Sequence, residues 1–147
     1  IQQHESSPHA AAITSVTWSE DGKRYATTSR DRTAKVFELE GDRLLVSYAM
    51  HERSVGGIAW LADGPVTADE TGRLRSLPME DANYVRATLD RLPAKLFRLY
   101  SIDNTLIVPS LPEFRSLQLK TESYEEGKDK EGKPKKKWRS WFEDRWS

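Results

Sequence analysis

The amino-acid sequence has 147 residues, of which 37% are apolar, 31% charged and 10% aromatic, and 23 basic side chains balance 23 acidic ones. No stretch approaches the roughly 18 consecutive apolar residues of a membrane-spanning helix, so we expect a soluble protein. The zero net charge argues against attraction of the whole surface to nucleic acid or anionic lipid. Since cysteine is absent, disulfides, thiolate catalysis and cysteine metal sites are excluded.

The chain starts at Ile1 rather than at Met, and no basic region followed by an apolar run indicates a signal peptide. We expect a processed product, a fragment or one part of a split protein, and the cellular compartment stays open. Residues 1–8 are interpreted as a leader, in which His4 has no assignable partner.

An internal repeat is the strongest signal in the sequence. His9 precedes Trp18 by nine positions, and His51 precedes Trp60 by the same nine. Each Trp is followed three positions later by an Asp-Gly pair, so four positions match at a single offset of 42 residues. Self-similarity at such a period is typical of repeat folds such as propellers and solenoids.

The first copy reads as four short strands. Its runs of β-branched and aromatic residues are separated by turn-forming residues, such as the hairpin pair Asp21-Gly22. The predicted strands are Ile13–Trp18, Tyr25–Ser29, Thr33–Leu39 and Leu44–Tyr48. Four short antiparallel strands in about 42 residues are the layout of a propeller blade.

The later copies are more divergent. Strands are predicted in the second copy at 65–68 and 73–77, and in the third at 95–101, 105–108 and 114–119. The segment Met79–Leu92 is interpreted as a strand plus loop, with a short helix as the alternative. The predicted blades span residues 9–50, 51–92 and 93–120. Closed propellers use about four to eight blades, so three blades predict an incomplete ring.

The composition changes at Thr121. Residues 121–137 contain no aliphatic side chain and are predicted to be a charged linker that does not pack. In the segment 138–147 four aromatic residues follow the spacing of one helix face, which predicts a short amphipathic helix beginning after Pro134. These residues are Trp138, Trp141, Phe142 and Trp146.

A basic cluster adjoins this aromatic segment, and it includes Lys135, Lys136 and Lys137. Basic side chains beside aromatic ones can bind phosphate backbones and stack on bases, or hold a helix at a membrane surface. A third interpretation, which we favour, is that the aromatic segment docks on a protein partner.

The first copy resembles a blade of the WD-repeat β-propeller family. The matching residues are His9, 16–18, 21–22, 25–33 and 36–38, with Phe37-Glu38 in place of the eponymous Trp-Asp pair. In that family a His, a Ser or Thr, an Asp and a Trp form a hydrogen-bonded chain that fixes the blade. The resemblance assigns these roles to His9, Thr27, Asp31 and Phe37. Phe37 has no N–H, so the last link is expected to be missing.

In the second copy the resemblance retains His51. Thr71 and Leu77 stand where the Asp and the Trp would fall, with Asp69 or Glu70 as alternative carboxylates. Trp18 and Trp60 are expected to be structural blade residues, and the segment 121–147 matches nothing in the family.

A metal site or a catalytic histidine is the competing interpretation of His9 and His51. Because both occupy equivalent positions of the repeat, we expect a structural role. The neighbouring carboxylates Glu20-Asp21 and Asp69-Glu70 lie in predicted turns, where Asp binds the local backbone. No nucleotide-binding, acyl-transfer or zinc-protease motif is present in the sequence. We therefore expect no catalytic residue, metal, cofactor or small-molecule substrate.

The sequence thus predicts an all-β chain of about three WD-like blades with a short C-terminal helical extension. The expected function is that of a non-enzymatic interaction scaffold, a subunit of a larger complex that binds protein partners. Two alternatives stay open. In the first, the chain is the propeller portion of a larger enzyme, for example a redox enzyme, whose catalytic domain lies outside this chain. In the second, the chain binds nucleic acid or membrane surfaces through its tail.

Overall fold

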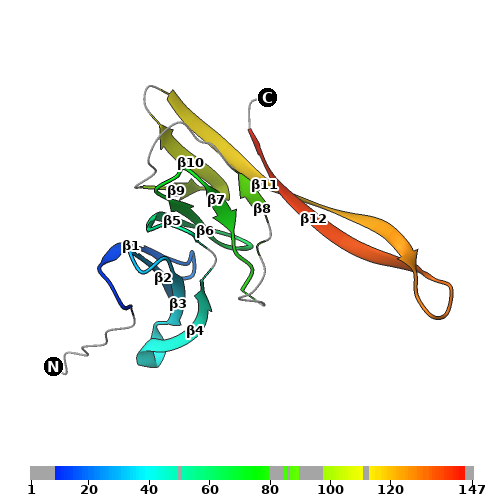
Figure 1. The fold of residues 1–147 in the computed structure, drawn as a ribbon, viewed down its shortest axis with the longest axis horizontal. Coiled ribbons are helices and arrows are strands. Elements are labelled where there is room, and N and C mark those ends of the chain that lie inside the picture. Colours follow the sequence, from blue (N-terminus) through cyan, green and yellow to red (C-terminus); the bar gives the residue numbers. More distant parts are fainter. Residues whose placement is uncertain are drawn as a thin grey trace.

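A computed structural model of the chain describes residues 9–49, 51–79, 85, 87–89, 98–110 and 113–144. They form three antiparallel sheets of four strands each, arranged side by side (Figure 1). The predicted all-β fold is therefore confirmed. The described residues include one short 3-10 helix, η1 (Glu40–Asp42), and no helix that is long and apolar enough to cross a membrane.

The first sheet follows chain order and agrees with the predicted strands. It contains β1 (Ile13–Trp18), β2 (Arg24–Ser29), β3 (Ala34–Glu38) and β4 (Arg43–Tyr48). Strand alternation separates the side chains of β3, so that Ala34 and Val36 are buried against the second sheet while Phe37 lies on the opposite face. Both faces of this sheet are therefore apolar.

The second sheet lies between the other two and is the most buried. It contains β5 (Val55–Leu61), β6 (Gly64–Asp69), β7 (Leu74–Ser76) and β8 (Ala87–Leu89). Every residue of β6 is buried, because both faces of this sheet are covered by neighbours. β8 agrees with the strand interpretation of the segment 79–92; positions 80–84, 86 and 90–92 lie outside the described residues.

The third sheet extends beyond the predicted third copy. It contains β9 (Tyr100–Ile102), β10 (Thr105–Ser110), β11 (Glu113–Lys128) and β12 (Pro134–Asp144). Residues 95–97 of the predicted strand lie outside the described residues. The fourth strand of this sheet, β12, comes from the C-terminal tail.

The predicted linker 121–137 and the predicted helix from 138 are both wrong for the described residues. β11 and β12 form one long hairpin that extends away from the three sheets (Figure 1). A two-stranded ribbon has both faces in water, so it needs no aliphatic residues. Pro134 is tolerated as the first residue of a strand. Gly132 takes a left-handed conformation (φ 81°) in the connecting turn.

Two apolar clusters fill the spaces between the sheets. Between the first and second sheets lie Ala26, Ala34, Val36, Tyr48, Ile58 and Leu77. Between the second and third lie Ala59, Leu61, Val66, Ala68, Leu74, Leu99, Leu106, Val108 and Leu117. The Tyr48 hydroxyl is buried and donates a hydrogen bond to the Pro78 carbonyl at 2.7 Å, which joins the first sheet to the second.

The first strands of the three sheets, β1, β5 and β9, lie next to one another. Gly57 in β5 permits this approach, because a Cβ there would lie only 3.3 Å from the Leu99 side chain. The Asn104 side chain accepts a hydrogen bond from the Ala62 N–H at 2.8 Å, which links the β9–β10 turn to the β5–β6 turn.

We expect Gly64→Ala to destabilise the chain by about 3 kcal/mol, because Gly64 has φ of 126° and a Cβ would lie 2.6 Å from the Leu77 carbonyl oxygen. Gly22→Ala is the matched control. Gly22 also has positive φ (69°) but an open surrounding, so that the cost is about 1 kcal/mol. Urea unfolding followed by tryptophan fluorescence measures both; equal midpoints for the two variants would contradict the prediction.

Candidate functional site

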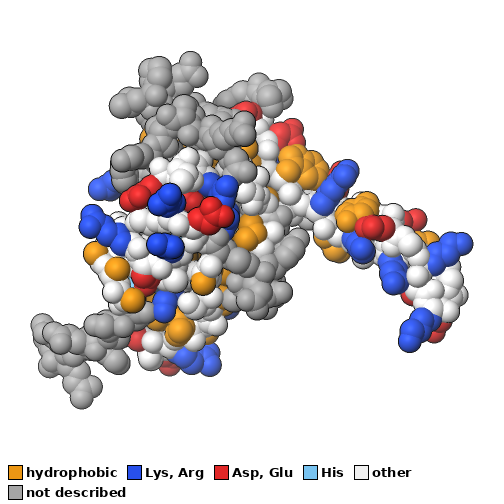
Figure 2. Space-filling view, in the orientation of Figure 1, with side chains coloured by type: hydrophobic (Ala, Val, Ile, Leu, Met, Phe, Trp, Pro, Cys, Tyr) orange, Lys and Arg blue, Asp and Glu red, His pale blue; other side chains and the backbone are white. Residues whose placement is uncertain are grey.

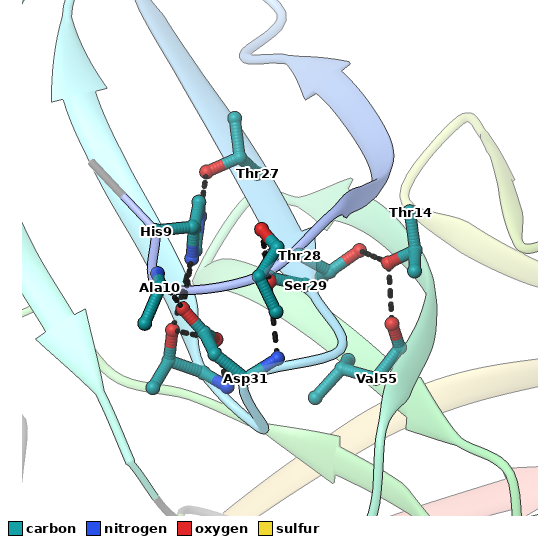
Figure 3. A network of polar contacts seen from close by, with 10 residues as sticks. His9, Ala10, Thr14, Thr27, Thr28, Ser29, Asp31 and Val55 are labelled. Atoms are coloured by element: carbon teal, nitrogen blue, oxygen red, sulfur yellow. Dashed lines mark hydrogen bonds and ion pairs between the residues drawn. The ribbon is translucent and has the colours of Figure 1, made fainter. Parts of the chain in front are cut away.

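His9 is at the centre of a polar network in the first sheet (Figure 3). Its Nδ1 lies 2.9 Å from Asp31 Oδ2, and its Nε2 lies 2.7 Å from Thr27 Oγ1. An ionised carboxylate only accepts hydrogen bonds, so Nδ1 donates to Asp31 and Nε2 accepts from the Thr27 hydroxyl. The structure therefore brings together three of the four residues that the resemblance singled out.

The turn between β2 and β3 positions the carboxylate. Asp31 accepts hydrogen bonds from the Thr33 hydroxyl, the Thr33 N–H and the Ala10 N–H, at 2.6, 2.9 and 3.0 Å. Desolvation would raise the pKa of Asp31, but the hydrogen bonds from Thr33 and His9 outweigh it and hold the pKa well below its usual range. Thr33, which the sequence interpretation did not single out, is thus part of the network.

His51 has an equivalent network in the second sheet. Its Nδ1 lies 3.1 Å from Asp69 Oδ2, and its Nε2 accepts from the Thr67 hydroxyl. Asp69 also accepts hydrogen bonds from the N–H and the hydroxyl of Thr71. Of the two alternative carboxylates, Asp69 contacts the histidine and Glu70 is exposed.

The two networks place their carboxylate at different positions of the same turn. Backbone hydrogen bonds from Ser29 to Thr33 and from Asp69 to Arg73 align Ser29 with Asp69. In that alignment Thr71 occupies the position of Asp31, so the hydroxyl and carboxylate residues are exchanged. The offset between copies is 40 residues here rather than 42, because the β5–β6 turn is shorter than the β1–β2 turn. This change of offset is the signal that would have identified Thr67.

Burial affects the pKa values of His51 and Asp69 in the second network. The side chain of His51 is fully covered, and burial lowers the pKa of His51 despite the hydrogen bond to Asp69. Desolvation would raise the pKa of Asp69, but its hydrogen bonds with Thr71 and His51 lower it. The histidine is therefore neutral and the aspartate ionised at neutral pH.

Phe37 is not a member of the polar network. Its ring stacks on Tyr25 with the centroids 5.1 Å apart, and Tyr25 in turn contacts Trp18 at 5.4 Å. Strand register places Trp18, Tyr25, Phe37 and Leu44 in one row on the face away from the second sheet. On that face Trp18 is 53% exposed and Leu44 is 48% exposed.

A cleft of about 680 Å³ lies where the β1–β2, β5–β6 and β9–β10 turns meet, and Trp18 and Trp60 line it. The carboxylate of Asp21, which lines the cleft, forms its hydrogen bonds within the β1–β2 turn. Asp21 accepts from the Ser19 hydroxyl at 2.7 Å and from the Lys23 N–H at 2.9 Å, and these bonds lower the pKa of Asp21. Within the described part of the chain, no group of three metal-ligating side chains is present.

The aromatic residues of the tail lie on both faces of the β11–β12 hairpin, so the predicted single aromatic face is wrong. Trp138 and Phe142 share one face, and Trp141 lies on the other. Phe142 packs against the core between the second and third sheets, whereas Trp138 is 66% exposed and Trp141 is 37% exposed. Trp146 lies outside the described residues.

Charged side chains cover the rest of the hairpin (Figure 2). Lys135, Lys136 and Lys137 are exposed on β12. Lys137 forms an ion pair with Glu126 at 3.1 Å, and Arg139 forms one with Glu122. Cross-strand pairs of opposite charge stabilise antiparallel strands, which explains how so polar a sequence forms a long hairpin.

Comparisons with known proteins agree with this architecture. The family described as WD domain, G-beta repeat matches residues 2–38. The protein transport protein SEC13 of Coccidioides immitis (strain RS) is 51% identical to this chain over 41 residues. The segment matched by the family contains β1, β2 and β3, so the first sheet is similar to a WD repeat. The three sheets have the fold of β-propeller blades and are called the first, second and third blade.

Solved structures show the same fold. A chain in the crystal structure of the mitotic checkpoint complex matches 75% of this chain with a TM-score of 0.66 and 18% identity. The β-propeller domain of Myceliophteria thermophila Cps50 (Swd1) matches 75% of it with a TM-score of 0.61 and 12% identity. These matches span 35% and 36% of the solved chains, and the SEC13 match spans 26% of this chain and 14% of that protein.

Acidification should destabilise the folded chain through His51. The pKa of His51 is lowered from 6.5 in the folded state, so the unfolded state binds an additional proton as the pH falls below about 6.5. The free energy of unfolding therefore falls from pH 7 to pH 5, and it falls further below about pH 4 as Asp69 and Asp31 are protonated. Urea midpoints at each pH measure this. If His51→Gln retained the whole decrease between pH 7 and 5, the assignment would be incorrect.

The exchange of carboxylate and hydroxyl positions between the blades can be tested directly. Asp69→Ser should destabilise the chain by about 2 kcal/mol, because buried His51 loses its partner. Adding Thr71→Asp recreates the first-blade arrangement of Ser29 and Asp31 and should restore most of this loss. Thermal or urea unfolding of the single and double variants decides the outcome, and a double variant no more stable than Asp69→Ser would refute the exchange.

Proposed function

We propose that this chain is a non-enzymatic, protein-binding subunit of a larger complex, and that its C-terminal hairpin docks on a protein partner. The observation that carries the proposal is the exposure of two tryptophans, Trp138 and Trp141, on a hairpin that extends away from the blades (Figure 1). Exposed tryptophans are costly in water and are typical centres of protein interfaces.

The polar networks support a scaffold rather than an enzyme. His9 and His51 each use both ring nitrogens for hydrogen bonds within the blade, and their side chains are almost fully covered. A general base or a metal ligand needs a nitrogen that faces a substrate or an ion. The family comparison agrees, because the related SEC13 and checkpoint-complex chains are described as a transport protein and as part of a complex.

A second apolar surface supports assembly with other proteins or blades. On the face of the first blade away from the second, Val16, Trp18 and Leu44 are about half exposed (52%, 53% and 48%). A blade has two apolar faces and becomes stable when a neighbour covers each of them. The first blade therefore has a face that fits a further packing partner.

Affinity capture of the tagged chain from its own cells tests the docking of the hairpin. Replacing both Trp138 and Trp141 by Ala should lower partner retention about tenfold or more, because buried interface tryptophans commonly contribute about 2 kcal/mol or more. Leu39→Ala is the matched control, since it removes a 47% exposed apolar side chain from the first blade. Undiminished retention by the double tryptophan variant would refute the proposal.

A further inference from the structure

β12 has an open edge. It is the terminal strand of its sheet, and no strand in the described part of the chain pairs with its outer side. β11 pairs with β10 only up to Leu117, so the hairpin beyond this residue is a two-stranded ribbon. An open edge carries unpaired N–H and C=O groups, which can accept an additional strand.

The side chains of β12 form two rows, because alternate residues of a strand point to opposite faces. One face carries Lys135, Lys137 and Arg139, spaced two residues apart. The other face carries Lys136 and the 66% exposed Trp138. A row of cations thus lies on one side of the ribbon and an aromatic anchor on the other.

The charges of the ribbon are arranged strand by strand. On the cationic face, the β11 residues Glu122 and Glu126 form ion pairs with Arg139 and Lys137 of β12. The Arg139 guanidinium also lies 5.7 Å from the centre of the Tyr124 ring. In these ion pairs the acidic residues therefore lie on β11 and the basic residues on β12. Opposite charges on adjacent strands are favourable, so an acidic strand is the complement of the outer edge.

We infer that the outer edge of β12 binds an extended, acidic segment of a protein partner as an additional antiparallel strand. Its carboxylates occupy alternate positions beside Lys135, Lys137 and Arg139, and the intervening apolar side chains contact Trp138. The ligand is thus a strand in which acidic and apolar residues alternate. This inference rests on the proposed docking function of the hairpin and specifies its partner.

Two other occupants fit the edge less well. A second copy of β12 would place lysines and arginine beside lysines and arginine, and like charges on adjacent strands are destabilising. A nucleic acid would cover both strands of the ribbon, so that its phosphates would lie beside Glu122 and Glu126. An added acidic strand lies next to β12 alone, about 4.8 Å away and twice as far from β11.

The test uses the full chain and a fluorescein-labelled peptide, Glu-Val-Glu-Leu-Glu-Val-Glu-Thr, measured by fluorescence polarisation in low salt. We expect saturable binding that weakens at least tenfold in Lys135→Glu/Lys137→Glu and in Trp138→Ala. The matched control is Lys130→Glu/Lys133→Glu, which makes the same change of charge in the β11–β12 turn and should alter the affinity less than twofold.

Two further peptides separate strand addition from simple charge attraction. N-methylation of alternate amides removes main-chain donors and should abolish binding, and an isomer with the four glutamates consecutive should bind at least tenfold more weakly. Equal binding of either peptide would overturn the inference, as would an equal loss in the turn control. Tighter binding of a fifteen-nucleotide oligo-dT than of the peptide would assign the edge to nucleic acid instead.

The two experiments together show whether the inference about the acidic strand fails or the proposed docking function fails. If the Trp138→Ala/Trp141→Ala variant loses its cellular partner while the wild-type chain does not bind the peptide, the hairpin docks on a partner of another chemistry and the inference is wrong. If the peptide binds as expected but the cellular partner is retained by that variant, the proposed docking function is wrong, and the inference fails with it.

Discussion

Each blade of this chain has apolar side chains on both faces, and a four-stranded sheet of this kind becomes stable only when neighbouring sheets cover it. The second blade meets this requirement fully, and β6 is buried along its whole length. The two clusters between the blades are the consequence, because each combines residues of two sheets. The packing of the second blade on the third also explains Gly57, where a Cβ would lie 3.3 Å from the Leu99 side chain.

The histidine networks connect segments within a single blade rather than between blades. Each one joins the segment before the first strand to the second strand and to the turn that follows it. The exchange of Ser29 and Asp31 for Asp69 and Thr71 leaves a carboxylate beside Nδ1 of the histidine in both blades, although it comes from different positions of the turn. The hydroxyl residue at the other position has a different role in each blade. Thr71 donates to the Asp69 carboxylate, whereas Ser29 accepts from the Asp31 N–H and leaves the carboxylate to Thr33.

In the third blade, the element that packs in the core is also the one that we propose to bind a partner. The base of the β11–β12 hairpin contributes Leu117, Leu119 and Phe142 to the core, whereas its outer part carries Trp138 and the lysines into solvent. One strand therefore anchors the hairpin and presents its edge. Cross-strand ion pairs and the packing of its base hold the two strands of the ribbon together. A preformed ribbon suits the proposed docking, because less conformational entropy is lost on binding.

The sequence alone determined the all-β fold and the strands of the first blade, because repeat spacing, strand alternation and turn residues are local signals. The residues around His9 came from the resemblance of the first copy to the WD-repeat family. The tertiary structure decided what depends on contacts distant in the sequence. It selected Asp69 over Glu70 as the partner of His51, and the shorter β5–β6 turn aligns Asp69 with Ser29 of the first blade. It also made the tail a hairpin rather than a linker and a helix. The aromatic spacing fits a helix in isolation, but pairing with β11 gives β12 backbone hydrogen bonds along its inner edge and ion pairs for Lys137 and Arg139. No local pattern encodes that pairing.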